Sequence, residues 1–332
     1  MRLVFVGDVM LGRLVNARLA ACPPEYPWGD TLPLLHAADA VFINLECVLS
    51  DRGEPWPGKV FTFRSDARNV AVLSAARVTA ASLANNHSLD YGPDALLDCL
   101  AVLRERRILA AGAGASLEAA RRPAVCAIRG GRAALVAFTD NEPGWEAGPA
   151  APGIFYVPLA GRTPRLDALL GAVADARRRS DLVIVSAHWG PNWGRAPLPE
   201  HVEAARLLVD AGADVVFGHS PHICRGVEVY RERPILYSCG DYIDDYAVDP
   251  VERNDESCIF RVDCASGRVR RVVLTPTVIR EFQARLAHGR ERAGILDTMR
   301  RLCAELGTAT RDVAEGLEIP CGAGPAAVPG AT

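Results

Sequence analysis

Polar side chains that could bind a metal ion or move a proton follow five short apolar runs of this sequence. They are the carboxylates, amides and imidazoles of Asp8, Asn44, Glu46, Asn85, Asn86, His87, His188, His219 and His222. Four of the seven histidines fall in these places, so histidine is concentrated there. Carboxylates and imidazoles suit Zn, Mn or Fe, and an amide oxygen can complete such a site. The pattern therefore predicts a site for one or two divalent metal ions.

Such a site would favour hydrolysis. Two metal ions joined by a bridging carboxylate can hold the attacking and leaving oxygens of a phosphoryl displacement. His87, directly after Asn86, would then act as a general acid or stabilise an oxyanion. A plainer explanation exists for single residues, since Asn85 can orient its loop through backbone hydrogen bonds and Asp8 can cap a turn. Five such clusters at five strand ends favour the site.

The rest of the sequence predicts a scaffold that gathers strand ends. Apolar runs predict strands over 3–6, 40–44, 78–84, 133–139, 181–187, 213–218, 234–240, 257–263 and 269–275. Helical patterns cover 93–107, 165–179, 200–212 and 280–305. Alternation of strands with helices indicates parallel pairing, and the uninterrupted strands from about 226 to 275 indicate an antiparallel section. We predict an α/β fold of two packed mixed β-sheets flanked by helices, with the site at the strand ends.

Composition excludes several classes of function. The formal net charge of −3 and the pI of about 6.2 do not fit a nucleic-acid groove, which needs a basic surface. The start, MRLVFVGDVM, is typical of a buried strand, and no run approaches the ~18–20 apolar residues of a transmembrane helix. We expect a cytoplasmic protein without a membrane partner, whose ten cysteines are reduced. We expect a small molecule or a peptide as substrate, and the oligomeric state stays open.

Five motifs resemble, in order and spacing, the signature blocks of the CapA-type family, named for poly-γ-glutamate capsule biosynthesis. They are GDVMLGR, NLE, ANNH-x-x-DYG, AHWG and GH-x-PH. The family lies within the calcineurin-like metallophosphoesterase superfamily, and the resemblance covers roughly residues 1–280. GKVFTFR at 58–64 is similar to a further block, in which Lys59 would bind an anion. YSCGDYIDDY at 237–246 resembles a block that usually has Gly-Asn in place of Gly240-Asp241.

The resemblance implies a calcineurin-like metallophosphatase fold and a role for each matching residue. Asp8 and His222 would hold the first metal, and Glu46 would bridge the two metals. The second metal would be held by Asn86, His188 and His219. Catalysis would depend on His87, facing the substrate, with Asp8 and His219. The substrate would be contacted by Asn44, Lys59, Asn85, Trp189 and Asn192.

Two departures from the family pattern change what we expect of the site. The first motif of the superfamily is usually Asp-x-His, but its third position here is Met10, so the first site lacks a ligand. The block after AHWG often continues with Glu-Tyr, whereas this chain has Asn192-Trp193. The substrate is therefore expected to differ from that of typical capsule members.

Three functions follow from these observations. The favoured one is metal-dependent hydrolysis of a phosphoester or of a peptide or amide bond. The second is a peptide epimerase that exchanges the proton at a Cα with little or no metal, using Asp8 or Glu46 with His87 or His219. The third is a non-catalytic subunit of capsule assembly. We expect a membrane anchor for that role, and its absence from the sequence pattern counts against this function.

The remaining expectations concern organisation and residues outside this set. We predict a domain over 1–280, a helical extension over 281–305 and a flexible tail over 306–332. Asp90 and Tyr91 are expected to begin the helix around Pro93, with Asp94 in its first turn. An acidic cluster of Asp241, Asp244 and Asp245 could bind a cation, but a solvated loop is the favoured interpretation. Surface positions are expected for His36, His201 and His288.

Overall fold

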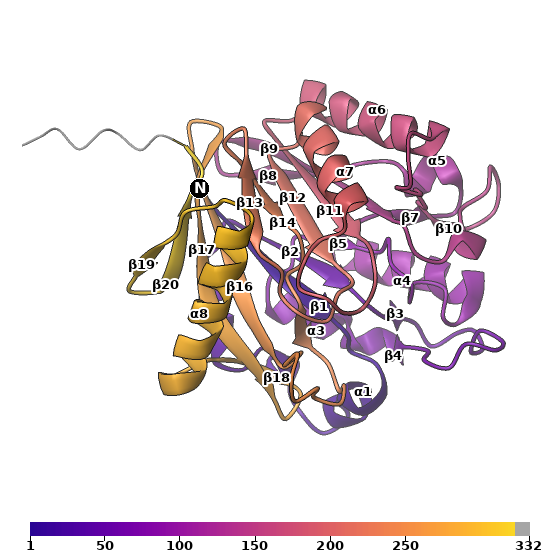
Figure 1. Ribbon diagram of the computed structural model, residues 1–332. Helices are drawn as coiled ribbons and strands as arrows, with labels where there is room; N and C mark the ends of the chain where they lie inside the picture. The colour runs from indigo at the N-terminus through magenta and orange to yellow at the C-terminus, as the bar shows by residue number, and fades with distance from the viewer. Residues whose placement is uncertain (323–332) are drawn as a thin grey trace, which may run out of the picture.

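The computed structural model describes residues 1–322, which form two β-sheets packed face to face between layers of helices (Figure 1). The first sheet contains β1 (Arg2–Val9), β2 (Ala40–Leu45), β5 (Ala80–Ser82), β6 (Leu109–Ala111), β15 (Asp241–Ile243), β16 (Glu256–Ala265), β17 (Arg268–Arg280), β18 (Gln283–Leu286), β19 (Arg311–Val313) and β20 (Gly316–Pro320). The second contains β8 (Ala124–Ile128), β9 (Gly131–Thr139), β11 (Leu182–His188), β12 (Val215–His219), β13 (Val227–Tyr230) and β14 (Arg233–Leu236). Two small sheets pair β3 (Val48–Leu49) with β4 (Arg64–Ser65) and β7 (Ala113–Gly114) with β10 (Gly153–Ile154).

Both large sheets are mixed, which confirms the predicted fold class. The order of the first sheet is β19-β20-β17-β16-β1-β2-β5-β6, with β15 beside β1 and β18 beside β17. The order of the second is β13-β14-β12-β11-β9-β8. Strands β1, β2, β5 and β6 are parallel, as are β9, β11, β12 and β14. The pairs β16–β17 and β13–β14 are antiparallel, as expected for the later part of the chain.

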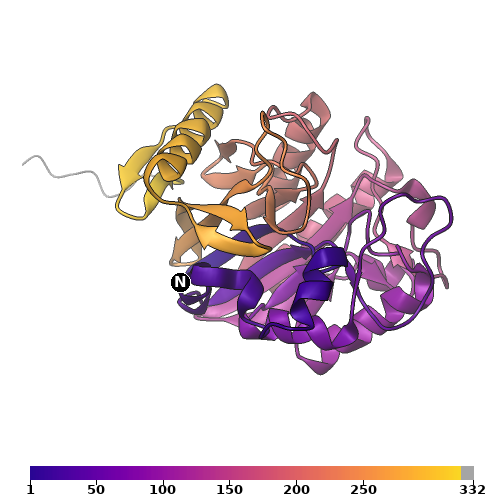
Figure 2. The same ribbon diagram turned by 90° about the horizontal axis from the view of Figure 1, so that it is seen from below.

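The helices lie on the outer faces of the sheets and at one edge. They are α1 (Arg13–Leu19), α2 (Leu32–His36), α3 (Val70–Ala75), α4 (Gly92–Glu105), α5 (Leu117–Ala120), α6 (Pro164–Arg179), α7 (Pro199–Asp210) and α8 (Gly289–Glu305), with 3-10 turns η1 (Tyr26–Thr31), η2 (Ala67–Asn69) and η3 (Pro143–Trp145). Figure 2 shows α8 at one edge of the sheets, apart from the first helices of the chain. No helix of residues 1–322 is long and apolar enough to cross a membrane.

Alternation along the central strands explains the layers. Leu3 and Phe5 of β1 point into the core between the sheets, where the Phe5 ring lies 5.1 Å from that of Phe42 and 5.2 Å from that of Phe217. Val4 and Val6 point the other way, into the core beneath the N-terminal helices. Because both faces of the strand are covered, its sequence is continuously apolar.

The C-terminal residues differ from the expectation. Residues 283–286, predicted as part of a helix, form β18, which pairs with β17, and α8 begins only at Gly289. Residues 311–320, predicted as part of a flexible tail, form β19 and β20, and β20 extends the first sheet beside β17. Leu317 and Ile319 of β20 are buried, which explains why this short segment is ordered. Residues 323–332 of the predicted tail lie outside the described residues.

Only the first half of the predicted strand over 234–240 is a strand, and the rest of that range crosses between the two sheets. β14 ends at Leu236 in the second sheet, and β15 begins at Asp241 in the first, beside β1. The backbone crosses close to Gly7, where a Cβ would lie 1.9 Å from the carbonyl oxygen of Gly240. The amide of Asp8 donates to that same oxygen at 2.9 Å. The crossing therefore needs a glycine at position 7 and places Asp241 opposite Asp8.

Candidate metal centre

The predicted site residues converge because the parallel strands of both sheets end at the same edge. Asp8 is in register with Asn44 on β2, and His188 of β11 is in register with His219 of β12. Each of these buried strands thus ends in a polar side chain, at its last residue or the one before. That side chain lies beside the polar side chain of the neighbouring strand. This arrangement is the one expected for ligand sites in parallel sheets.

Asp8, His188 and His219 form one buried cluster. One ligand atom from each lies within 4.8 Å of the others. The Nδ1 atoms of His188 and His219 are 2.8 Å apart, and Nδ1 of His219 is 4.0 Å from Oδ1 of Asp8. On its other side, Nε2 of His219 bonds the hydroxyl of Ser186 at 2.6 Å, which fixes the orientation of the ring. Two imidazoles and a carboxylate form a donor set suited to Zn, Mn or Fe.

Asp8 also belongs to another cluster, at the predicted first metal site, with His222 and Asp241. These ligand atoms again lie within 4.8 Å of one another, and Nδ1 of His222 is 2.9 Å from Oδ1 of Asp241. Asp241 was expected in a solvated loop, but it is wholly buried, and its neighbour Asp244 is only 5% exposed. The expectation of a solvated loop was therefore wrong. One carboxylate, Asp8, is shared by the two clusters.

Several buried polar atoms of these clusters lack a hydrogen-bond partner within residues 1–322. They are Oδ2 of Asp8, Oδ2 of Asp241, Nε2 of His188 and Oδ1 of the neighbouring Asn86. Burying an unpartnered polar atom is costly, so such atoms are expected to bind something in the working protein. All four are metal-ligand atoms. The residues therefore fit a divalent metal centre.

Burial sets the protonation of the cluster. Burial raises the pKa of Asp8 to about 6 and that of Glu46 well above its ordinary value. It lowers the pKa of His219 to about 3 and that of His188 well below its ordinary value, so both imidazoles are neutral and each carries one nitrogen lone pair. Burial also lowers the pKa of His222, but the Asp241 carboxylate outweighs this effect and the net shift is upward.

Glu46 and Asn44 lie beside Asp8 without joining either cluster. The amide nitrogen of Asn44 donates to Oδ1 of Asp8 at 2.8 Å and to Oε2 of Glu46 at 2.9 Å. Asn85 in turn donates to the Asn44 side-chain oxygen at 3.0 Å and accepts from the amide of His87 at 3.0 Å. Asn44 and Asn85 are wholly buried and use their amides inside the protein. They position the carboxylates and the loop, contrary to the expectation that they contact substrate.

His87 lies beside Glu46 and is held by Asp90, a residue expected at the start of a helix. Nδ1 of His87 and Oδ2 of Asp90 are 2.6 Å apart, and α4 begins only at Gly92. The ring of Phe63 stacks on His87 with centroids 3.9 Å apart. Burial lowers the pKa of His87 to about 4, against the opposing effect of Asp90. The His-x-x-Asp spacing within ANNHSLDYG was the signal that could have identified this pair.

Two predicted substrate contacts, Lys59 and Trp189, are engaged inside the protein instead. The ammonium of Lys59 donates to Oδ1 of Asp90 at 2.6 Å and to the carbonyl of Asn86, so its charge is already paired. Trp189 is wholly buried, where its ring nitrogen donates to the carbonyl of Tyr237. Asn192 is exposed, and its carbonyl oxygen accepts from the amide of His222 at 2.9 Å, so the backbone supports the site.

Trp193 is a better candidate than Trp189 for the exposed side of the site. Its side chain is 42% exposed, and its ring lies 5.9 Å from that of His222 in an edge-on arrangement. His201, expected on the surface, is instead buried; it stacks on Trp189 and lies 3.1 Å from a carboxylate oxygen of Asp140. Its role is therefore internal packing.

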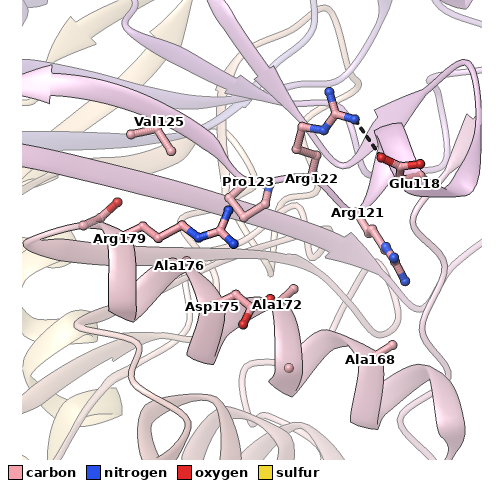
Figure 3. Close-up of a pocket in the computed structure, with 12 residues that line it drawn as sticks. Glu118, Arg121, Arg122, Pro123, Val125, Ala168, Ala172, Asp175, Ala176 and Arg179 are labelled. Atoms are coloured by element: carbon pink, nitrogen blue, oxygen red, sulfur yellow. Dashed lines mark hydrogen bonds and ion pairs between the residues drawn. The ribbon is translucent and has the colours of Figure 1, made fainter.

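A hollow of about 550 Å³ lies away from this centre, between α5, β8 and α6 (Figure 3). None of the predicted site residues lines it. Arg122 is paired with Glu118 of its own turn, and the Arg179 side chain extends across the hollow near Pro123 (Figure 3). The hollow is therefore separate from the candidate metal centre at the strand ends.

Comparison with known proteins agrees with the motifs. The family described as bacterial capsule synthesis protein PGA_cap matches residues 2–246, and the chain belongs to this family. A probable polyglutamine synthesis accessory protein of Mycobacterium tuberculosis is 35% identical over 91% of this chain and 83% of the relative. The PGA biosynthesis protein CapA of Bacillus subtilis is 28% identical over 83% of this chain and 71% of its own length. A hypothetical protein of Thermus thermophilus has a solved structure that matches 83% of this chain and 98% of its own, with a TM-score of 0.48 and 16% identity.

Proposed function

We propose that this protein is a metal-dependent hydrolase of a phosphoester or amide bond. The observation that carries the proposal is the sharing of Asp8 by two ligand clusters, in which Oδ2 of Asp8, Oδ2 of Asp241 and Nε2 of His188 are buried without a hydrogen-bond partner in residues 1–322. Divalent ions bound there would supply Lewis acidity that polarises the scissile bond. The low pKa values of His188 and His219 keep both rings neutral and ready to act as ligands.

The protein's own groups would orient the substrate and transfer a proton. With its Nδ1–H donated to Asp90, a neutral His87 presents the lone pair of Nε2, which lies 3.9 Å from Oε1 of Glu46. Held there, Nε2 can accept a proton during attack and return it to the leaving group. Trp193 beside His222 offers an exposed aromatic surface for the rest of the substrate.

The names of the relatives support a class of substrate. They describe proteins of polyglutamine synthesis and of PGA biosynthesis. We therefore propose a peptide polymer of glutamate or glutamine, or a precursor of such a polymer, as the natural substrate. The bond cleaved would be an amide of the chain or a phosphoester of an activated precursor.

The experiment uses two chromogenic probes, bis-p-nitrophenyl phosphate and γ-glutamyl-p-nitroanilide. The purified protein is stripped with a chelator and reconstituted with Mn²⁺ or Zn²⁺. We expect turnover of at least one probe that is lost on stripping, regained with metal and abolished in His188→Ala and His219→Ala. His36→Ala, which alters a histidine that bonds the carbonyl of Ala75 away from both clusters, serves as the matched control. Turnover that persists without metal would refute the proposal.

The epimerase hypothesis receives little support from the geometry. Glu46 and His87 approach to 3.9 Å, and Asp8 and His219 approach to 4.0 Å. An acid and a base that exchange a Cα proton must stand on opposite sides of that carbon, which does not fit between groups this close. Deuterium uptake from solvent into a glutamyl peptide, without cleavage, would nevertheless favour epimerisation over hydrolysis.

A further inference from the structure

We propose that Asp241 is a ligand of the first metal, in the place of the imidazole that this chain lacks at Met10. The inference rests on the proposed metal-dependent function and names a residue that the family motifs do not provide, since Gly-Asn usually stands at this position. It concerns the cluster of Asp8, His222 and Asp241, whose ligand atoms lie within 4.8 Å of one another.

The position of Asp241 follows from the crossing between the sheets. β15 runs parallel to β1, with Asp241 in register with Asp8. Both side chains are buried, at 0% and 1% exposure. Oδ1 of Asp241 contacts Nδ1 of His222 at 2.9 Å, whereas Oδ2 has no hydrogen-bond partner in residues 1–322. The free oxygen of Asp8, Oδ2, is likewise buried without a partner in that part of the chain.

Met10 cannot supply the missing ligand in the same way. It is wholly buried, and its sulfur accepts a hydrogen bond from the amide of Gly12 at 3.0 Å. A thioether is a soft ligand, which suits Cu(I) and not the harder Mn²⁺. The carboxylate of Asp241 is the group of this cluster that is both buried and chemically suited to replace the imidazole.

A purely structural role for Asp241 would leave two features unexplained. Holding the His222 ring requires one oxygen of Asp241, and the second oxygen would remain buried without a partner. In addition, the Asp8 and Asp241 carboxylates repel each other, and Asp244 adds a further buried carboxylate. A divalent cation held by Asp8 and Asp241 would remove both difficulties, because their free oxygens would become ligands and the positive charge would offset theirs.

The two clusters would then differ in metal preference. The first would present two carboxylates and one imidazole, whereas the second presents two imidazoles and the shared carboxylate. Oxygen ligands suit Mn²⁺ and Mg²⁺, and imidazole ligands suit Zn²⁺ and Fe²⁺. We therefore expect the first site to favour Mn²⁺ relative to the second.

The test measures metal binding and thermal unfolding of the chelated protein titrated with Mn²⁺. The test variants are Asp241→Asn and the double variant Met10→His with Asp241→Asn. The control is Asp245→Asn, which alters a neighbouring buried carboxylate outside both clusters. We expect two Mn²⁺ equivalents in the wild type and in Asp245→Asn. In Asp241→Asn the first site should weaken by about 10–100-fold or more.

Two further readouts separate a ligand from a structural residue. Without metal, Asp241→Asn weakens the contact with His222 but also relieves the repulsion between carboxylates, so its unfolding temperature should change little, whereas its stabilisation by Mn²⁺ should shrink. The double variant should regain the second equivalent and favour Zn²⁺ over Mn²⁺ at the first site. Two tight Mn²⁺ sites in Asp241→Asn, or a metal-free protein that is destabilised with its Mn²⁺ response intact, would overturn the inference and leave the proposed function standing. A wild type that binds no metal would overturn both.

Discussion

Replacing Asp90 with asparagine tests whether this carboxylate positions His87. Asp90 is wholly buried and contacts three donors, Nδ1 of His87, Nζ of Lys59 and the amide of Phe63, each at 2.6 Å. An asparagine keeps the shape of the side chain but offers a single acceptor oxygen. At least one of the three donors must therefore lose its acceptor.

The expected loss in the free energy of unfolding follows from these contacts. Breaking a buried ion pair by removing one partner costs about 3–5 kcal/mol. Lys59 is 17% exposed and keeps the carbonyl of Asn86, so we expect the lower limit, about 3 kcal/mol. With an unfolding entropy of about 2.1 cal/mol/K per residue over the whole chain, this loss lowers Tm by about 4 °C.

The assay combines thermal unfolding with ¹⁵N NMR of the His87 ring and turnover of the phosphodiester probe. Asp90 opposes the burial that lowers the pKa of His87 to about 4, so this pKa should fall further in the variant. The ring should also lose its preference for the Nδ1–H tautomer, and turnover should fall by about 10²-fold or more. Asp98→Asn, which removes a carboxylate bonded to Ser50, should cost only about 1 kcal/mol and leave turnover unchanged. If Asp90→Asn lowers Tm but changes neither the tautomer nor turnover, Asp90 is only a structural partner of Lys59.

Three further predictions concern the crossing, the thiols and acid stability. Gly7→Ala should destabilise the protein by about 3 kcal/mol or more in urea unfolding, because its Cβ would meet the Gly240 carbonyl, whereas Gly171→Ala in α6 has open space and should stabilise it by up to about 1 kcal/mol. Ellman's reagent should label at most Cys22 and Cys126, the two half-buried thiols, until the protein is unfolded; rapid labelling of more thiols would contradict the buried assignments. Because the pKa of His87 is lowered in the folded protein, the neutral ring stabilises the chelated protein fully above about pH 6.5. As pH falls toward 4, the free energy of unfolding should decrease by about 3 kcal/mol on this account. Thermal unfolding across that range should therefore show a smaller loss in His87→Gln than in the wild type.

Local sequence patterns were sufficient for the central strands and for the residues at their ends. The apolar runs before Asp8, His188 and His219 are strands β1, β11 and β12, and their lengths place the polar side chains at the last residue or next to it. Parallel pairing then brings neighbouring strand ends together, because register aligns them. The helices α4, α6 and α7 also lie within a few residues of their predicted limits, since amphipathic patterns and N-terminal prolines are local signals.

Local patterns failed where a segment depends on a distant partner. β18 and β20 are ordered by pairing with β17, and short segments of this kind carry too little apolar pattern to be recognised alone. Trp189 and His201 lie in the core because α7 packs on the second sheet, although a tryptophan or histidine next to a motif is equally compatible with a ligand pocket.

The family, the two-sheet fold and the polar residues at the strand ends can be read from the sequence alone, because they depend on residue type and on periodicity within each element. That Asp241 stands opposite Asp8, and that Asp90 holds both His87 and Lys59, emerges only from the packed structure. Asp241 reaches its place because the backbone crosses from one sheet to the other over Gly7. Lys59 reaches Asp90 across 31 positions of the chain. Such contacts form when separate segments pack together, and no local pattern encodes which charged groups will then share a buried site.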